Sequence, residues 1–438
     1  RVRSSAASDV YKRQIKYYST SGYQAKDSFI QDEKGNWYYF DNNGYLVTGA
    51  REIDGKKYYF LVNGIELRDA IREDRKGNQY YYNKIGQQVL NQYYSEDGSK
   101  WRYFDAQGVM ARDLVTIDGK VKFFDQNGYQ IKGKVAKAKD GKLRYFDANS
   151  GELVFNRFAP DGDNWYYFGA DGIAVTGIQK IANQTLYFDN NGVQVKGKIV
   201  TLADKSIRYF DADSGEMAVN KFIGLANNVW YYFNQLGKAV TGLQTINNQT
   251  LYFNQDGTQV KGKIVKSSDG KRYYFDVNSG ELVFNRFVEV SPNVWYYFGS
   301  DGRAYTGSHK VNNQQLYFDN NGVQAKGKLV SESGRTRYYD VNSGELATNR
   351  FVSVTPTERY YFNQNGVAVT GAQHIGGKYF YFDKDGKQVK GKAVTIKGIK
   401  YYYDANSGEL TRNRWARLEN GTWMFFDRYG RGQYYGWY

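Results

Sequence analysis

Five copies of one short motif carry the residues whose types could bind a ligand. The motif is Q-x-K-G-K, and each copy follows a turn that comes after an aromatic run. A Gln and a Lys two positions apart lie on the same face of a β-strand, so both can reach one ligand. The ring that precedes each pair can stack on the C–H face of a neutral sugar, while the amide and the ammonium bind its hydroxyls. The motif therefore predicts these carbohydrate-binding residues: Phe123, Gln130 and Lys132; Tyr187, Gln194 and Lys196; Tyr252, Gln259 and Lys261; Tyr317, Gln324 and Lys326; Tyr381, Gln388 and Lys390.

A Thr-Gly step in the preceding part of the repeat supplies a second set of candidates. Thr176 stands before Gly177, and Gln179 lies two residues beyond the glycine. We expect these residues to form the opposite wall of a pocket between adjacent hairpins. The corresponding positions are Thr241 with Gln244, Thr306 with His309, and Thr370 with Gln373.

Repetition itself offers a purely structural interpretation of both sets. Identical polar residues at identical positions of a repeat protein can form ladders or solvate one face. A Thr can also stand at the end of a strand simply because it favours β-structure. The binding and the structural interpretation both stay open on spacing alone.

Acid–base, nucleophilic and metal chemistry lack the residues that they need. An Asp follows most aromatic runs and a Glu follows most S-G pairs, but Asp is favoured at such turns, and an active site is usually one place rather than five. The chain has no Cys and only two His, His309 and His374, neither with a nucleophile partner. No G-x-S-x-G, phosphate-binding loop or zinc spacing occurs. We therefore predict no catalytic residue, no metal site, no cofactor and no enzymatic activity for this chain.

The charge favours an anionic surface as a partner more than a nucleic acid. There are 60 Lys and Arg against 45 Asp and Glu, which gives a net charge of +15. A basic chain with exposed rings could bind single-stranded nucleic acid. Here, however, the positive residues are spread evenly and interleaved with acidic ones, so we expect no nucleic acid partner. Attraction to an anionic bacterial wall is a more natural use of the charge. No run of about 18 apolar residues is present, so no membrane span is predicted.

These residues are positioned by an internal repeat. The Trp residues that precede an aromatic pair are Trp37, Trp101, Trp165, Trp230, Trp295 and Trp423, with Arg359 in the same position. Their spacings are 64, 64, 65, 65, 64 and 64, which gives six long repeats and the start of a seventh. Each long repeat holds three short units, so we count 19 units in all. Helix signals are weak throughout.

Each short unit is predicted to be a β-hairpin. Aromatic and β-branched runs flank turns such as Asp189–Gly192, whose sequence is DNNG. Alternation places Leu186 and Phe188 on the core face and Tyr187 outward; likewise Tyr166 and Phe168 point inward and Trp165 outward. A hairpin this small cannot bury a core alone. We therefore predict an all-β fold, an elongated β-solenoid of stacked short β-hairpins with one continuous aromatic spine.

The repeats also predict the segments of the chain. Residues 1–16 match nothing that follows, and we interpret them as a non-native or junction segment. Residues 17–112 are degenerate repeats, because IELRDA follows Gly64 and QQVLNQ follows Gly86 where the regular motif is expected. Residues 113–412 are regular repeats with the predicted sites, and residues 413–438 are a C-terminal partial repeat or cap.

The repeat units resemble a known family. WYYFGADGIAVTG, LYFDNNGVQVKGK and RYFDADSGEMAVNK are similar to the C-terminal glucan-binding repeats of glucansucrases of the dextransucrase and glucosyltransferase type, within the cell-wall/choline-binding repeat superfamily. The resemblance covers about residue 17 to the C-terminus. It implies a choline-binding-repeat-like β-solenoid that binds α-glucan (dextran-like polysaccharide) through pockets built from the aromatic residue, the Q-x-K pair and the nearby Thr. It also implies a secreted or cell-surface protein of a Gram-positive bacterium, with the bacterial cell wall as a second partner.

Other functions fit the same repeats. A choline- or teichoic-acid-binding wall anchor is the main alternative, although choline cages need several converging aromatic rings, often Trp, and Trp comes about once per 64 residues here. A receptor-binding repeat domain like those of large clostridial toxins and a structural spacer are two further alternatives. Nothing in this chain resembles a glucansucrase catalytic barrel, so we expect that it transfers no glucose by itself.

Overall fold

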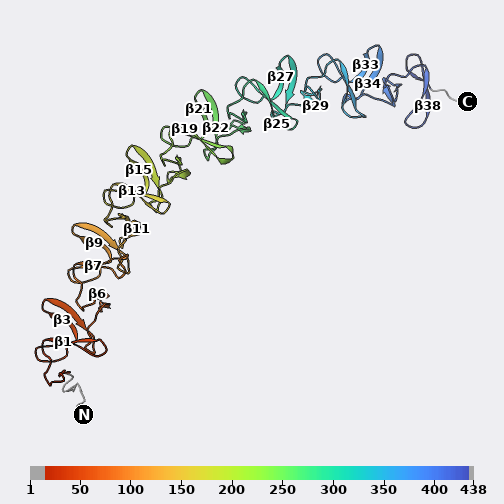
Figure 1. The fold of residues 1–438 in the computed structure, drawn as a ribbon. Helices are drawn as coiled ribbons and strands as arrows, with labels where there is room; N and C mark the ends of the chain where they lie inside the picture. The colour runs from red at the N-terminus through yellow and green to blue at the C-terminus, as the bar shows by residue number, and fades with distance from the viewer. Residues whose placement is uncertain (1–14, 434–438) are drawn as a thin grey trace. The chain divides into compact units, whose positions relative to one another are not determined.

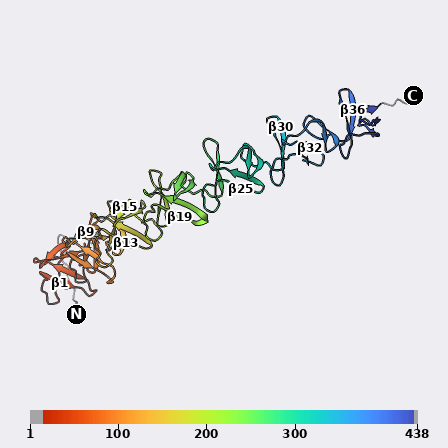
Figure 2. The same ribbon diagram turned by 90° about the horizontal axis from the view of Figure 1, so that it is seen from above.

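The fold is built almost entirely of two-stranded antiparallel hairpins. A computed structural model describes residues 15–433 of the chain. These residues form nineteen small sheets and no α-helix; a single 3-10 turn, η1 (Ala226–Asn228), is the one helical element among them. The chain divides into two compact units that part between Val219 and Asn220, and in each unit the hairpins follow one another in sequence order (Figures 1 and 2). The predicted all-β solenoid of 19 short hairpins is confirmed.

The strands of the first unit are three to five residues long. They are β1 (Ser28–Gln31), β2 (Trp37–Phe40), β3 (Gly49–Ile53), β4 (Lys56–Phe60), β5 (Ala70–Glu73), β6 (Gln79–Tyr82), β7 (Gln92–Tyr94), β8 (Arg102–Phe104), β9 (Asp113–Ile117), β10 (Lys120–Phe124), β11 (Lys134–Lys137), β12 (Leu143–Phe146), β13 (Arg157–Asp161), β14 (Asn164–Phe168), β15 (Gly177–Ile181), β16 (Gln184–Phe188), β17 (Lys198–Thr201) and β18 (Ile207–Phe210).

The second unit has the same design, and its last sheet gains a third strand. Its strands are β19 (Lys221–Leu225), β20 (Val229–Phe233), β21 (Gly242–Ile246), β22 (Gln249–Phe253), β23 (Lys263–Lys266), β24 (Arg272–Phe275), β25 (Arg286–Ser291), β26 (Val294–Phe298), β27 (Gly307–Val311), β28 (Gln314–Phe318), β29 (Lys328–Glu332), β30 (Arg335–Tyr339), β31 (Arg350–Ser353), β32 (Arg359–Phe362), β33 (Gly371–Ile375), β34 (Lys378–Phe382), β35 (Lys392–Ile396), β36 (Ile399–Tyr403), β37 (Arg414–Arg417), β38 (Trp423–Phe426) and β39 (Gly432–Gln433).

The main turn of each hairpin is not the one that the sequence suggested. We expected the aromatic strand to pair across the DNNG turn with the strand that follows. Instead β16 pairs with the preceding strand β15, from Gly177↔Phe188 to Ile181↔Gln184. The turn between them has positive φ at both central residues, 47° at Ala182 and 68° at Asn183, which matches the twist of paired strands.

The segment after the DNNG turn has a different role, because it links two hairpins. It forms a single bridge with its own hairpin, Phe188↔Gln194. The Gln194 backbone N–H then donates to the carbonyl of Trp165, in the hairpin before, at 2.8 Å. Neighbouring hairpins in a unit are therefore joined by backbone hydrogen bonds as well as by side-chain packing.

The hydrophobic core follows the predicted alternation. Leu186 is 1% exposed and Phe188 is fully buried, whereas Trp165 keeps 45% of its surface in solvent, as predicted. Full burial of one such ring stabilises the fold by about 1.5–3 kcal/mol. Within a unit, ring contacts such as Phe123 with Phe146 and Tyr145 with Phe168 link the buried residues of successive hairpins. Buried residues gather in separate clusters, each shared by neighbouring hairpins: one contains Tyr145, Val154, Ala159, Tyr166 and Phe168, and another contains Tyr274, Val283, Val288, Tyr296 and Phe298.

Two further expectations concern the extent of the chain. Residues 1–14 of the predicted junction segment lie outside the described residues, and the boundaries at 16, 112 and 412 remain predictions. Within residues 15–433, no helix is long and apolar enough to cross a bilayer.

Candidate functional site

The Gln and Lys of each Q-x-K motif reach the turn of the next hairpin. Gln194 Nε2 donates to the Ser214 carbonyl at 3.4 Å, and Lys196 Nζ donates to the Asp213 carbonyl at 2.9 Å. Both acceptors belong to the tight turn after β18. The two side chains therefore lie side by side, as predicted. Their hydrogen bonds connect one hairpin to the next.

One or both of these contacts recur in each of the other copies of the motif. Lys132, Lys261 and Lys390 donate to the carbonyls of Asn149, Asn278 and Asn406, each at 3.0 Å, and Gln259, Gln324 and Gln388 donate to the carbonyls of Ser279, Ser343 and Ser407 at 3.3, 3.3 and 3.2 Å. Gln130 Nε2 and Gln388 Oε1 are buried without a hydrogen-bond partner. The structural interpretation of the motif is thus realised at these positions, and a binding role for the same side chains stays a prediction.

The glycine of the S-G pair completes this contact. Gly215 has a φ of 74°, and a Cβ there would lie 2.5 Å from Gln194 Nε2. An L-residue is disfavoured twice, by the positive φ and by the clash with the amide. The glycine recurs because the Gln of the preceding hairpin packs directly on it.

The aromatic residue that we expected beside each Q-x-K pair is not freely exposed. The Tyr187 ring stacks on the buried Phe210 ring of the next hairpin, with centroids 5.4 Å apart. Corresponding contacts join Phe123 to Phe146, Tyr252 to Phe275, Tyr317 to Tyr339 and Tyr381 to Tyr403, at 5.5, 5.7, 5.6 and 5.7 Å. Phe123 is only 8% exposed, so the expectation of an outward ring is wrong there. The reason is that each ring covers the core of the following hairpin.

A different ring lies beside the Q-x-K pair. Lys261 Nζ is 5.1 Å from the Trp230 ring centroid, and Lys326 Nζ is 5.0 Å from that of Trp295. These distances are within the range of a cation–π contact. In four of the five motif copies the Gln backbone N–H donates to a Trp carbonyl, at 2.7 Å for Gln259 with Trp230, and this bond creates the proximity; Gln388 donates to the Arg359 carbonyl instead. The Trp residues were not among the predicted site residues, although their 64-residue spacing and outward position were visible in the sequence.

The four predicted Thr residues lie at the surface and share one local contact. All are exposed, and each carbonyl accepts a hydrogen bond from the side chain three residues on. The donors to Thr176, Thr241 and Thr370 are Gln179, Gln244 and Gln373, at 2.8, 2.7 and 2.7 Å, and His309 Nε2 lies 2.9 Å from the Thr306 carbonyl.

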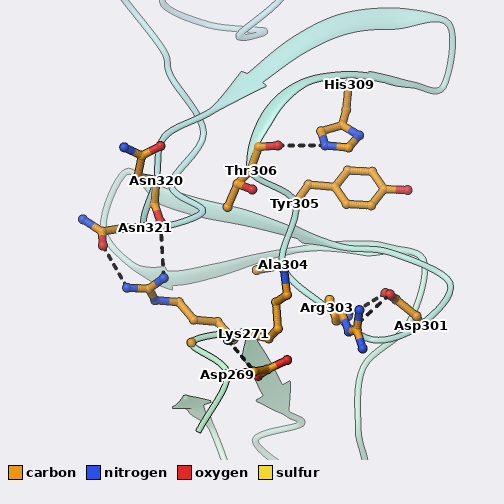
Figure 3. Close-up of a pocket in the computed structure, with 12 residues that line it drawn as sticks. Asp269, Lys271, Asp301, Arg303, Ala304, Tyr305, Thr306, His309, Asn320 and Asn321 are labelled. Atoms are coloured by element: carbon orange, nitrogen blue, oxygen red, sulfur yellow. Dashed lines mark hydrogen bonds and ion pairs between the residues drawn. The ribbon is translucent and has the colours of Figure 1, made fainter. Parts of the chain in front are cut away.

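One of these Thr residues lines a cavity of about 420 Å³ in the second unit (Figure 3). The walls are the tip of the β23–β24 hairpin, the segment that leads into β27, and the turn after β28. The cavity residues are Asp269, Gly270, Lys271, Arg272, Asp301, Arg303, Ala304, Tyr305, Thr306, His309, Asn320 and Asn321. Tyr317, Gln324 and Lys326 of the same repeat do not line it, so here the structure does not bring the predicted Thr and the Q-x-K motif into one pocket.

The Asp residues after the aromatic runs act as turn acceptors. Asp276 accepts hydrogen bonds from the backbone N–H groups of Asn278 and Ser279 and from the Arg286 guanidinium, at 2.9, 3.1 and 2.6 Å. These contacts, with Arg286 the largest, lower the pKa of Asp276 to about 2. A general acid or base works best with a pKa near the working pH, so the environment drives this carboxylate away from catalytic use. Among residues 15–433, no cluster of His, Asp and Glu could hold a metal ion.

The degenerate first repeat contains a charged version of the motif. Glu66 and Arg68 occupy the Gln and Lys positions and form an ion pair at 2.7 Å, with Arg68 over the Trp37 ring at 4.3 Å. The Glu66 side chain is fully buried, and this burial raises the pKa of its carboxyl above the usual value despite the ion pair. A Cβ at Gly86 would lie 1.6 Å from Glu66 Oε1, so the contact with the next turn is the same as in the regular repeats.

Comparisons with known proteins agree with this repeat design. The family described as choline-binding repeat matches residues 47–84, 111–158, 175–222, 240–287, 305–351 and 369–415, and the putative cell wall binding repeat matches residues 27–46, 156–174, 225–239 and 285–304. Together these matches cover most of the chain, and both describe binding repeats.

Two curated relatives and one solved structure illustrate the similarity. Glucosyltransferase-S of Streptococcus mutans is 49% identical over 96% of this chain and 24% of its own length. Glucosyltransferase-I of the same organism is 50% identical over 90% of this chain and 27% of its own length. The modular autolysin LytC from Streptococcus pneumoniae, solved with a synthetic peptidoglycan ligand, is 18% identical over 58% of this chain and 52% of its own, with a TM-score of 0.39.

The chain spans about a quarter of the length of the two glucosyltransferases. The described residues consist of the hairpin repeats throughout, and the matched family descriptions are those of repeats. The chain therefore belongs to the choline-binding repeat family, and over nearly all of its length it is homologous to two streptococcal glucosyltransferases.

Proposed function

We propose that this chain is a non-catalytic module that binds α-glucan, a dextran-like polymer of glucose, through several weak sites along the repeats. The observation that carries the proposal is the recurrent pairing of a Trp ring with the Lys of a Q-x-K motif, at Trp230 with Lys261 and at Trp295 with Lys326. The homology with glucosyltransferases, enzymes named for transfer of glucosyl groups, supports glucose polymers as the ligand class.

The contacts within the motif are compatible with binding. An ammonium has three N–H donors, so Lys261 keeps two after it donates to the Asn278 carbonyl. The Gln259 amide likewise keeps its carbonyl oxygen after Nε2 donates to Ser279. The internal hydrogen bonds fix both groups in place, which reduces the ordering cost when a sugar hydroxyl binds.

Weak sites in a row suit a polymer ligand. Once one site holds the chain, binding at the next site becomes intramolecular, so the overall affinity rises by about 10²–10⁴ without any new contact. Because glucan presents the same sugar along its whole length, the repeat spacing does not have to match a unique ligand sequence.

The decisive experiment is affinity electrophoresis in gels that contain dextran. We expect the full chain to be retarded, and we expect soluble isomaltooligosaccharide to relieve the retardation. Replacing Trp165, Trp230 and Trp295 together by Ala should weaken retardation at least about tenfold, because several sites are lost at once. Trp423→Ala is the matched control, since Trp423 has the same position in the repeat but no Q-x-K pair follows it in this sequence. Migration unchanged by dextran would overturn the proposal.

The name of the matched family favours choline as a second candidate ligand. Choline recognition uses aromatic faces that receive a cation. At Trp230 and Trp295 a lysine ammonium of the chain already lies over the ring. Retention on a choline column with elution by free choline, in the absence of any retardation by dextran, would favour choline instead.

The cellular setting belongs to the same proposal. We place this module in a secreted or surface-bound glucosyltransferase or glucan-binding protein of a Gram-positive bacterium. The support is the streptococcal origin of the relatives and the cell wall binding repeats matched by the sequence.

A further inference from the structure

The cavity in the second unit differs from the corresponding positions of other repeats. Its lining includes Arg272, Arg303, Tyr305 and His309. At the corresponding positions on either side of Trp165 the chain has Leu143, Ile173, Val175 and Gln179, and on either side of Arg359 it has Thr336, Val367, Val369 and Gln373. At these four positions the cavity therefore has two arginines and two aromatic rings, where the corresponding positions have aliphatic residues, Thr or Gln.

The positive charge of the cavity is only partly balanced. Arg303 Nε lies 3.5 Å from Asp301 Oδ2, and the carboxylate of Asp269 accepts hydrogen bonds from the Ser267 hydroxyl and the Lys271 backbone N–H. Three cationic side chains thus face two carboxylates, which leaves one net positive charge on the cavity walls.

Arg272 carries one of these positive charges, and no carboxylate of the described residues is bound to its guanidinium. Its guanidinium donates to the Asn321 side-chain oxygen at 2.8 Å and to the Asn320 carbonyl at 3.4 Å, both uncharged acceptors. Arg272 forms no ion pair within residues 15–433. In contrast, the arginines one position further along the corresponding hairpins are neutralised, because Arg144 pairs with Asp140 at 2.7 Å and Arg337 pairs with Glu332 at 2.5 Å.

A flat apolar surface lies in the same cavity. The Tyr305 and His309 rings are stacked, with centroids 4.0 Å apart and planes 16° from parallel (Figure 3). His309 is held in this position by the contact of its Nε2 with the Thr306 carbonyl. A stacked pair of rings is a surface that suits the C–H face of a sugar.

We propose that this cavity binds a sugar that carries one anionic group. Arg272 holds the phosphate or carboxylate, because a planar guanidinium fixed by neutral acceptors keeps further N–H donors for an oxyanion. The Tyr305–His309 pair contacts the sugar ring, and the Asn320 and Asn321 side chains bind hydroxyls. The site goes beyond the neutral-glucan binding proposed above, since it takes a charged ligand and does not use the Q-x-K motif.

The test is isothermal titration of the full chain at low ionic strength with glucose, glucose 6-phosphate, glucuronic acid and inorganic phosphate. We expect glucose 6-phosphate, glucuronic acid or both to bind at least about tenfold more tightly than glucose, because a charge-assisted bidentate contact is added. The comparison of the two charged sugars identifies phosphate or carboxylate as the preferred group. Equal affinity for glucose and both charged sugars would overturn the proposal.

Variants separate this cavity from general charge attraction. Arg272→Leu, which installs the residue type of the corresponding Leu143, should weaken binding of the charged sugar about tenfold. Arg335→Leu is the matched control, because it removes the same charge from the next repeat at a residue outside the cavity. An equal loss in both variants would show nonspecific attraction and contradict the site. The double variant Tyr305→Val with His309→Gln should bind the charged sugar no more tightly than it binds inorganic phosphate.

The test of this cavity can be separated from the test of glucan binding. Arg272→Leu should leave retardation by dextran unchanged, and its thermal unfolding should match that of the unaltered chain. If dextran fails to retard the protein while the charged sugar still binds, the proposed function falls and this site stands. If dextran retards the protein and no charged sugar binds more tightly than glucose, the reverse holds.

Discussion

The residues of the Q-x-K motif and the glycine that they contact stabilise the packing of neighbouring hairpins, whether or not a ligand binds. The Lys196 ammonium and the Gln194 amide donate to backbone carbonyls of the next turn, and Gly215 leaves room for that amide. A turn carbonyl that lost such a donor would have to be resolvated, at a net cost of about 0.5–1.5 kcal/mol per bond. For this reason substitutions in the Q-x-K motif test stability and binding together, whereas substitutions of the Trp rings test binding more directly.

Glu66 offers a prediction that depends on pH. Its carboxyl is buried with Oε1 unpartnered, and its pKa is raised in the folded protein. The folded state therefore binds the proton more tightly than the unfolded state does, so stability is lost as pH rises from the unfolded pKa through the folded pKa. Glu66→Gln, the residue of the regular repeats, should raise the stability at pH 7 by about 1 kcal/mol, and this gain should shrink near pH 4.

Thermal unfolding at the two pH values measures this effect. Glu33→Gln is the control, because Glu33 is exposed and its substitution removes the same charge. A gain of equal size at pH 4 and pH 7, or a loss of stability at pH 7, would show that the buried charge is not what limits the first repeat.

At the scale of the hairpin, the two-residue turn controls the pairing. Asn247 and Asn248 have φ values of 51° and 64°, and Asn312 and Asn313 have 48° and 64°. Asn tolerates this left-handed region better than most other residues do. The turn therefore fits the right-handed twist of the strands on either side, and it fixes their register.

One hairpin has a less suitable residue at this place. Ala182 has a φ of 47° where the related hairpins have Asn247 and Asn312. Ala182→Asn should stabilise the protein by about 0.5–1 kcal/mol, because Asn adopts this conformation with less strain. Urea unfolding measures the change. Ala372→Asn, at an exposed strand position, should be neutral or destabilising, and an equal gain there would contradict the explanation.

The hairpin is also where prediction from sequence succeeded in part. Alternation identified the buried Leu186 and Phe188 and the exposed Trp165 correctly, because the two-residue period of a strand is a local property. The pairing partner of the aromatic strand was wrong. The chain can turn at DNNG and at Ala182–Asn183, and only the hydrogen bond of the segment at Gln194 with the preceding hairpin decides between the two pairings.

At the scale of the whole molecule, the core is a series of small clusters and the proposed ligand sites are repeated. Each cluster is shared by neighbouring hairpins, so stability is a sum of local interfaces. Repetition of weak sites at nearly constant spacing makes avidity, rather than a single strong site, the expected source of affinity for a polymer.

The net charge of +15 gives a prediction at this scale. Dextran is uncharged, so its retention should change less than about twofold between 50 and 500 mM salt. Adsorption to an anionic wall polymer should be lost over the same range, because the screening length between exposed charges falls from about 14 Å to about 4 Å. Gel retardation and sedimentation with the polymer measure the two effects. A strong salt dependence of dextran retention would indicate that charge, and not ring stacking, holds the glucan.

The sequence by itself determined the repeat, the number of hairpins, the inward face of the aromatic strands and the residue types of the Q-x-K motif. These features depend on local periodicity and on turn-forming residues, both of which can be recognised within a short stretch of sequence. Only the tertiary structure decided which strand pairs with which, that Tyr187 covers the core of the following hairpin, and that the ring beside the Lys of the Q-x-K motif is a Trp. Contacts between hairpins join residues about 20 to 30 positions apart, and the packing of neighbouring hairpins rather than the strand period brings them together.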